Sequence, residues 1–175
     1  MKRLLFVILA CMSLCCYAQV PFNNEVVTGS FSALNGKVAN LDIVYETVHN
    51  MSVADFAEYE QDWNVDKPEI EGYILNKANI ALNGSCYLKM GKGEDLTVRI
   101  VVNTVSVKGD HSFEVLLVDK SEKVLGKISG LFGKGGLFGT KLKLIKDGAK
   151  STGKRVGALL KKYIKKKVHS PSFSP

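Results

Sequence analysis

The sequence has few of the residues that build disulfides and metal centres: among 175 residues there are four cysteines and three histidines. Three of the cysteines lie within the first sixteen residues, and only Cys86 follows them. A single remaining cysteine can form neither an internal disulfide nor a cysteine metal site. The chain must therefore fold around an apolar core, which its length permits, and we expect Cys86 to be a small buried hydrophobe in that core.

Motifs for catalysis and for bound ions are also missing. The sequence contains no H-E-x-x-H pair, no G-x-S-x-G elbow and no calcium loop of the D-x-[DN]-x-[DN]-G type. His49, His111 and His169 stand far apart in the sequence. These absences predict a protein that is not an enzyme and that uses no metal and no cofactor.

Long apolar runs are missing after the first eighteen residues, where no stretch approaches the roughly 20 apolar residues of a membrane span. The chain begins with Lys2 and Arg3, continues with an apolar run over residues 4–16, and reaches Ala18 before Gln19. This order is typical of a secretory signal peptide. It predicts a signal peptide at residues 1–18, cleavage after Ala18, and an exported protein that is periplasmic or secreted. A lipoprotein anchored at Cys11, after Ile8-Leu9-Ala10, is the alternative.

Charge is distributed unevenly. The whole chain carries +7, but residues 140–175 hold eleven lysines and arginines against Asp147 alone, which is +10. Residues 19–139 are correspondingly acidic, at −5. A basic average of this kind is not a nucleic-acid signature. The lysines also lack the interleaved aromatic residues of a single-strand platform, so we expect no nucleic-acid partner.

Hydrophobic periodicity predicts one domain over residues 19–168 and a disordered tail over 169–175. Asn35-Gly36 predicts a hairpin of residues 25–34 and 37–48. Ser52 and Asp55 predict a capped helix, Pro68 the start of a second helix, and Asn83-Gly84 its end. Strands are expected at 96–107, 112–118 and 123–129, and a long helix at 141–167. The expected fold is α+β, in the order ββααβββα: a mostly antiparallel sheet, made of the N-terminal hairpin and a three-strand meander, covered by helices.

The sequence GLFGKGGLFG occupies residues 130–139, between the last expected strand and the basic helix. It fits neither the Walker phosphate loop nor the G-x-G-x-x-G dinucleotide pattern, because Gly135 and Phe138 stand at positions that require other residues. We therefore expect a mobile, glycine-rich loop. Its large apolar side chains either fold over the core or stay exposed as a contact for a partner or a membrane. These side chains are Leu131, Phe132, Leu137 and Phe138.

The last helix is amphipathic and basic. Its apolar stripe includes Val156, Leu160 and Ile164, and lysines flank the stripe. Such a helix either covers a sheet with its lysine face in water or lies on an anionic membrane surface. The lysines proposed as contacts are Lys161, Lys162, Lys165 and Lys166. The acids over residues 55–71 are expected on solvated helix faces, with a glycosidase-like carboxylate pair as the remote alternative.

The segment FEVLLVDKSEKVLGKIS, followed after a glycine-rich gap by GKRVGALLKKYIKKK, resembles small exported bacterial envelope proteins. Their α/β module is similar to the TolB N-terminal domain and to the periplasmic part of the curli-secretion lipoprotein CsgG. The resemblance covers roughly residues 38–167 and concerns the order of elements. It implies an accessory or binding module at the envelope, and it transfers no catalytic residue.

These observations together predict a non-enzymatic, secreted protein of the cell envelope that binds a partner. The alternative is a peripheral membrane-binding module that uses residues 130–139 and the basic C-terminal helix. The expected partner is therefore an envelope protein or an anionic membrane surface, and the oligomeric state is left open.

Overall fold

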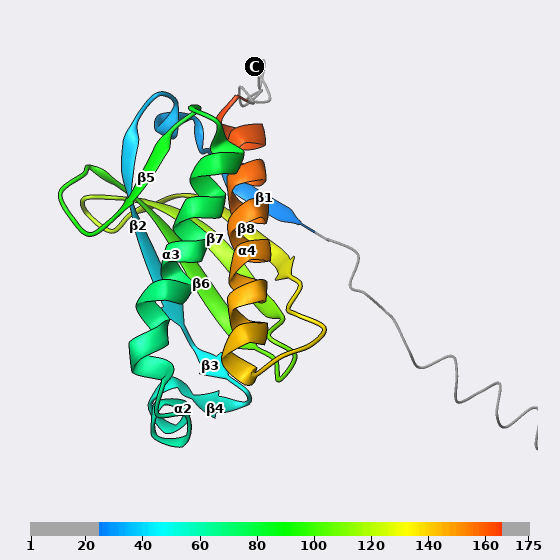
Figure 1. Cartoon of the computed structure of the whole chain (residues 1–175). Helices are drawn as coiled ribbons and strands as arrows, with labels where there is room; N and C mark the ends of the chain where they lie inside the picture. Colours follow the sequence, from blue (N-terminus) through cyan, green and yellow to red (C-terminus); the bar gives the residue numbers. More distant parts are fainter. Residues whose placement is uncertain (1–24, 166–175) are drawn as a thin grey trace, which may run out of the picture.

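The computed structural model describes residues 25–165, which form a sheet of eight strands with helices packed on one of its faces (Figure 1). The predicted signal peptide and the predicted tail both lie outside these residues. The strands are β1 (Val26–Gly29), β2 (Val38–Tyr45), β3 (Thr47–Val48), β4 (Met51–Ser52), β5 (Tyr87–Met90), β6 (Leu96–Val105), β7 (His111–Asp119) and β8 (Val124–Gly133). The helices are α2 (Val53–Tyr59), α3 (Trp63–Leu82) and α4 (Lys141–Ile164), and a 3-10 helix, η1 (Ser32–Leu34), precedes β2.

The predicted α+β class is confirmed, and the sheet is mixed. Its main order is β1-β8-β7-β6-β2-β5, with the short pair β3 and β4 beside β6. The predicted meander is present, because β6, β7 and β8 are antiparallel neighbours. β2 runs parallel to both β6 and β5. Parallel neighbours cannot be joined by a tight turn, and the segment with α2 and α3 makes the crossover between β2 and β5.

The predicted N-terminal hairpin is wrong: β1 pairs with β8, while β2 lies in the other half of the sheet. Asn35 and Gly36 do form a turn, closed by the Lys37 N–H donating to the Leu34 carbonyl at 3.0 Å. Asn35 has φ −57° and ψ 117°, and only Gly36 has a positive φ, of 67°. This is type II geometry, whose twist does not suit a two-residue hairpin. Residues 30–34 separate β1 from this turn, which leads directly into β2.

The predicted helix signals are largely confirmed. The Ser52 hydroxyl accepts from the Asp55 N–H at 3.1 Å and caps α2. α3 ends at Asn83, in the left-handed conformation, followed by Gly84. Its start differs from the prediction, because α3 begins at Trp63 and contains Pro68. The fully buried Trp63 side chain ties this first turn to the core, which explains the earlier start.

Helices α3 and α4 pack side by side against the sheet (Figure 1). The expected apolar stripe of α4 is confirmed, since Val156, Leu160 and Ile164 are buried. Gly153 and Gly157 face α3, where an added Cβ would lie 2.4 Å from the Ile74 carbonyl oxygen and 2.3 Å from that of Ala78. The two helices approach each other closely because these positions have no side chain.

The two faces of the sheet differ. In β6, Val98, Ile100 and Val102 are fully buried, whereas Arg99 and Val101, which point the other way, are half-buried. Within residues 25–165, both long helices lie on the buried side (Figure 1). Cys86 lies in the core, as expected, and burial raises the pKa of its thiol to about 11.

Candidate functional site

The glycine-rich stretch is divided between a strand and a loop. Residues 130–133 belong to β8, which ends four residues later than predicted. Leu131 lies opposite Phe113 and is 2% exposed, so it is a core residue. Phe132 lies opposite Ser112 on the face away from the helices and is half-buried. The expectation that all four apolar side chains share one loop is therefore wrong for the first two.

Leu137 and Phe138 lie in the loop between β8 and α4 and are 78% and 84% exposed. Hydrogen bonds hold this loop on both sides, unlike the mobile loop expected. The Lys134 N–H donates to the Ser151 hydroxyl at 3.0 Å, and the Gly135 N–H donates to the Asp110 carboxylate at 2.8 Å. On the other side, the Thr140 hydroxyl caps α4. Two large apolar groups thus project into water from a well-anchored backbone.

Two further exposed side chains, Val107 and Tyr59, lie near this loop. Gly135 packs so closely on the β6–β7 turn that an added Cβ would lie 2.0 Å from the Lys108 carbonyl oxygen. Val107, at 64% exposure, is in the same turn. The Lys141 ammonium lies 4.2 Å from the ring centroid of Tyr59, which is 58% exposed. We refer to Tyr59, Val107, Leu137 and Phe138 together as the apolar tip.

The predicted contact lysines fall into two groups. Lys162 donates to Glu25 at 2.6 Å, and the Tyr163 hydroxyl donates to the same carboxylate at 2.7 Å. These two contacts lower the pKa of Glu25 and hold the start of β1 against α4. Lys161 and Lys165 form no ion pair with another residue among 25–165. Lys166 lies outside the described residues.

The apolar tip and these lysines stand at opposite ends of α4. The helix has 24 residues, and at 1.5 Å per residue it is about 36 Å long. Figure 1 shows the loop before α4 at one end of the molecule and the last turn of α4 at the other. The structure therefore does not bring the two predicted contact groups together.

Three of the acids over residues 55–71 form ion pairs with α4. Asp66 and Glu69 both bind Lys146 of α4, at 3.2 and 2.7 Å, and Glu60 lies 3.7 Å from Lys141. His111 is buried and shares a 3.1 Å hydrogen bond with Thr152; burial lowers its pKa to about 4. Within the described part of the chain, no group of three or more histidine, cysteine, aspartate or glutamate side chains could hold a metal ion.

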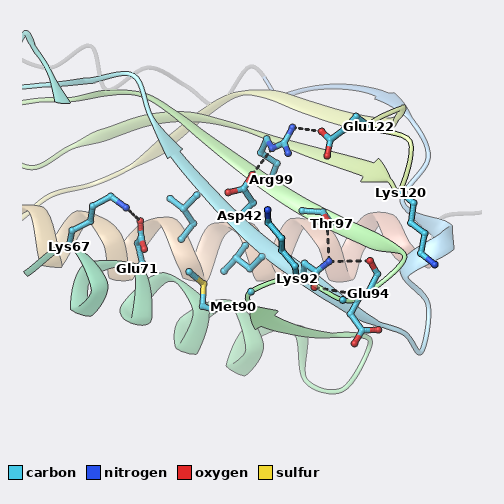
Figure 2. Close-up of a pocket in the computed structure, with 15 residues that line it drawn as sticks. Asp42, Lys67, Glu71, Met90, Lys92, Glu94, Thr97, Arg99, Lys120 and Glu122 are labelled. Carbon is cyan, nitrogen blue, oxygen red and sulfur yellow. Dashed lines mark hydrogen bonds and ion pairs between the residues drawn. The ribbon is translucent and has the colours of Figure 1, made fainter. Parts of the chain in front are cut away.

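A groove of about 710 Å³ lies along one side of β2 (Figure 2). Its walls come from β2, from the first half of α3, from the start of β6 and from the loop that joins β5 to β6. Both Asp42 and Ile43 line it, although successive side chains of a strand point to opposite faces of the sheet. The groove therefore wraps around the edge of β2.

Ion pairs surround this groove. The Arg99 guanidinium donates to Asp42 at 2.7 Å and to Glu122 at 2.8 Å, while Lys67 binds Glu71 (Figure 2). The hydrogen bonds to Glu122 and Asp42 raise the pKa of Arg99. Lys92 also lines the groove, is exposed, and has no ion pair within residues 25–165.

This groove was not predicted, because it depends on β5. That strand has only four residues and was not predicted. A weak signal was available: a buried Leu88 between the more exposed Tyr87 and Lys89, bounded by Gly84 and Gly91. So short an alternation does not establish a strand, and its parallel pairing with β2 depends on tertiary contacts.

No protein-family model matches the sequence, and no curated protein matches it. The fold is similar to two crystal structures of the PelC dodecamer from Paraburkholderia phytofirmans. One, in space group P6, aligns with a TM-score of 0.47 at 14% identity. The other, a leucine-to-methionine variant in space group C2, aligns with 0.45 at 16% identity. Each alignment covers 79% of this chain and 96% of the PelC chain.

At these scores the likeness supports no inference about activity or assembly. The resemblance to the TolB and CsgG modules stays a prediction. No helix among residues 25–165 combines the length and the apolar character needed to cross a membrane.

Proposed function

We propose that this chain is a non-enzymatic, exported protein of the cell envelope that binds a protein partner through the apolar tip. The observation that carries the proposal is the exposure of Leu137 and Phe138 on an anchored loop. Large apolar groups gain free energy when a partner covers them, and exposed clusters of this kind mark interaction sites. Export is inferred from residues 1–18.

The polar side chains support binding rather than catalysis. The carboxylates of Asp66 and Glu69 are engaged by Lys146 in joining α3 to α4. The His111 imidazole lies in the core with Thr152. Each of these groups has a structural use, and we assign no catalytic residue, no cofactor and no nucleic-acid contact.

An anionic membrane is the second candidate for the tip. The favouring observation is that exposed Lys108 and Lys134 adjoin the apolar side chains, without an ion pair to another described residue. Exposed apolar groups beside lysines suit an anionic lipid interface. Lys161 and Lys165 would reach the same bilayer only if α4 lay along the membrane plane.

Site-specific photocrosslinking tests the first candidate. Benzoylphenylalanine in place of Phe138, in cells that export the protein, should give a covalent adduct with a distinct partner. Val124 is the control site, because it is exposed and is the first residue of β8, at the opposite end of that strand from the loop. Adducts at neither position, or the same adducts at both, would contradict a specific contact at the tip.

Sedimentation with vesicles tests the membrane candidate. The mature protein is mixed with vesicles that contain phosphatidylglycerol, at low salt, where electrostatic attraction is strongest. Vesicle binding that disappears in the double variant Leu137→Ser, Phe138→Ser would show that the tip contacts a lipid surface rather than a protein partner. An absence of binding at low salt removes the membrane candidate.

A further inference from the structure

The groove beside β2 points to a second contact. We infer that it binds an extended peptide segment of a partner protein, which adds as a strand to the edge of β2 and places an acidic side chain against Lys92. This contact is separate from the apolar tip and does not depend on it.

The first step is the free edge of β2. β5 pairs with β2 only from Val38 to Leu41, whereas β6 pairs with β2 up to Tyr45. From Asp42 onwards, the described residues place no strand on the β5 side of β2. The groove begins where the β2–β5 ladder ends, and Met90, the last residue of β5, lines it.

The second step is the direction of the backbone groups. The Glu46 N–H donates to Val102 of β6 at 2.9 Å, whereas the Lys37 carbonyl accepts from Tyr87 of β5 at 3.0 Å. Backbone groups of successive residues in a strand alternate between its two sides. Odd-numbered residues of β2 therefore direct their N–H and C=O groups towards β5. Ile43, one pairing step beyond the ladder, presents these groups to the groove.

The third step is the shape of the groove. The first half of α3 forms one wall through Lys67 and Glu71, and β2 forms the other, as Figure 2 shows. A slot between a helix and a strand edge admits an extended chain, whose main-chain groups then continue the sheet hydrogen bonding. A volume of 710 Å³ is within the usual range of ligand sites.

The fourth step is charge. The Arg99 guanidinium is shared between Asp42 and Glu122, which leaves this cluster one negative charge, and Lys67 is matched by Glu71. Lys92 is the groove cation without an ion pair among the described residues. It lies between Gly91 and Gly93, and the space beside both glycines is open. A carboxylate on the incoming segment would pair with Lys92. We therefore expect the bound segment to carry an acidic side chain.

A small-molecule ligand fits these observations less well. Such sites usually hold several convergent buried polar groups. The buried side-chain atoms without a hydrogen-bond partner belong, among the described residues, to Tyr45, His49, Trp63, His111 and Arg155. None of these residues lines the groove. The unused polar groups at the groove are instead the main-chain groups of an edge strand.

The test starts from a random eight-residue peptide library displayed on phage and selected on the mature protein. We expect enrichment of peptides with an aspartate or glutamate. The best peptide is then synthesised, and its Kd is measured by fluorescence anisotropy with the protein and its variants. Failure to enrich any acidic peptide would overturn the proposal.

Lys92→Glu should weaken binding at least tenfold, and changing the acidic residue of the peptide to lysine should restore affinity for this variant. Lys154→Glu is the matched control, because Lys154 is also exposed and has no ion pair with a described residue. It should leave the Kd unchanged. Equal losses for both variants would show a general charge effect and contradict a contact at Lys92.

Two further measurements test strand addition. Peptides with an N-methyl group at single positions should lose binding at alternate positions, because only every second N–H faces β2. Hydrogen exchange at the Ile43 amide should slow in the complex. Uniform tolerance of N-methylation, or unchanged exchange at Ile43, would overturn strand addition. The double variant Leu137→Ser, Phe138→Ser should bind the peptide normally, which separates this contact from the apolar tip.

Discussion

The two copies of Gly-Leu-Phe-Gly, residues 130–133 and 136–139, have the same sequence and opposite environments. The first copy is the end of β8, where Leu131 reaches the core opposite Phe113. The second copy follows the last residue of the sheet, and its Leu137 and Phe138 project into water. A four-residue pattern thus has no fixed burial. Pairing with a neighbouring strand decides which leucine becomes part of the core.

The largest expected difference between the copies is in stability. Leu131→Ala removes a buried side chain and leaves a cavity, which costs about 2–5 kcal/mol of the free energy of unfolding. Leu137→Ala alters an exposed side chain and should change that free energy by no more than about 0.5 kcal/mol. Urea denaturation of the two variants checks the difference, and similar losses would place the two leucines in equivalent environments.

A second difference concerns pH, because Gly133 of the first copy lies opposite the buried His111. Burial lowers the pKa of His111 from 6.5 to about 4, so between these values the unfolded chain binds more protons than the folded protein. The contribution of His111 to the free energy of unfolding is therefore fully present above pH 6.5 and is lost as the pH drops from 6.5 towards 4. At 1.36 kcal/mol per pKa unit, the loss is about 3 kcal/mol.

The measurement is urea denaturation between pH 4 and 7 for the unchanged protein and for His111→Leu. The variant should lose this contribution to the pH dependence, whatever its stability at pH 7. An unchanged slope in His111→Leu would assign the effect to other groups. Phe138→Ser should keep the slope of the unchanged protein, because the second copy has no contact with His111 among the hydrogen bonds of residues 25–165.

The phenylalanines offer a finer comparison. Phe132 is half-buried on the face of the sheet away from the helices, so Phe132→Ser should cost about 1 kcal/mol in lost apolar burial. Phe138→Ser should cost less than about 0.5 kcal/mol, since Phe138 is largely in water. Thermal unfolding of the two variants measures the difference. A larger loss in Phe138→Ser would mean that the tip packs on the core.

The smallest effect is expected at the far end of α4. Lys162→Gln removes the contact with Glu25 and should lower the free energy of unfolding only slightly, with a smaller loss at high salt, because the ion pair is exposed to solvent. Lys161→Gln is the neighbouring control, because Lys161 has no ion pair with a described residue. Denaturation at low and high salt compares them, and equal behaviour would mean that the Glu25 contact adds nothing to stability.

Signals that act over a few residues were sufficient for much of the fold. The Ser52 cap, the end of α3 at Asn83 and the buried stripe of α4 are decided by neighbours along the chain, and the structure confirms them. Pairing between distant strands was not predictable in this way. The Asn35-Gly36 turn is present, yet with one positive φ instead of two it is type II, and β1 pairs with the distant β8.

The candidate sites, too, were predictable only where they depend on neighbouring residues in the sequence. Two residues of the tip, Leu137 and Phe138, could be named from sequence because two leucine–phenylalanine pairs among glycines are conspicuous, whereas Tyr59 and Val107 were not predicted. Their separation into a buried and an exposed copy could not, because it depends on how far β8 pairs with β7. The groove was missed because it exists only where the four-residue strand β5 ends beside the longer β2.

By itself, the sequence determined the α+β class, the helix caps, the apolar stripe of α4 and the division into an acidic body and a basic end. All of these depend on composition or on contacts within about one helical turn. Only the tertiary structure decided the mixed strand order, the fate of each Gly-Leu-Phe-Gly copy and the free edge of β2. The physical reason is that strand pairing joins residues far apart in sequence, and the free energy of that pairing comes from packing that local patterns do not encode.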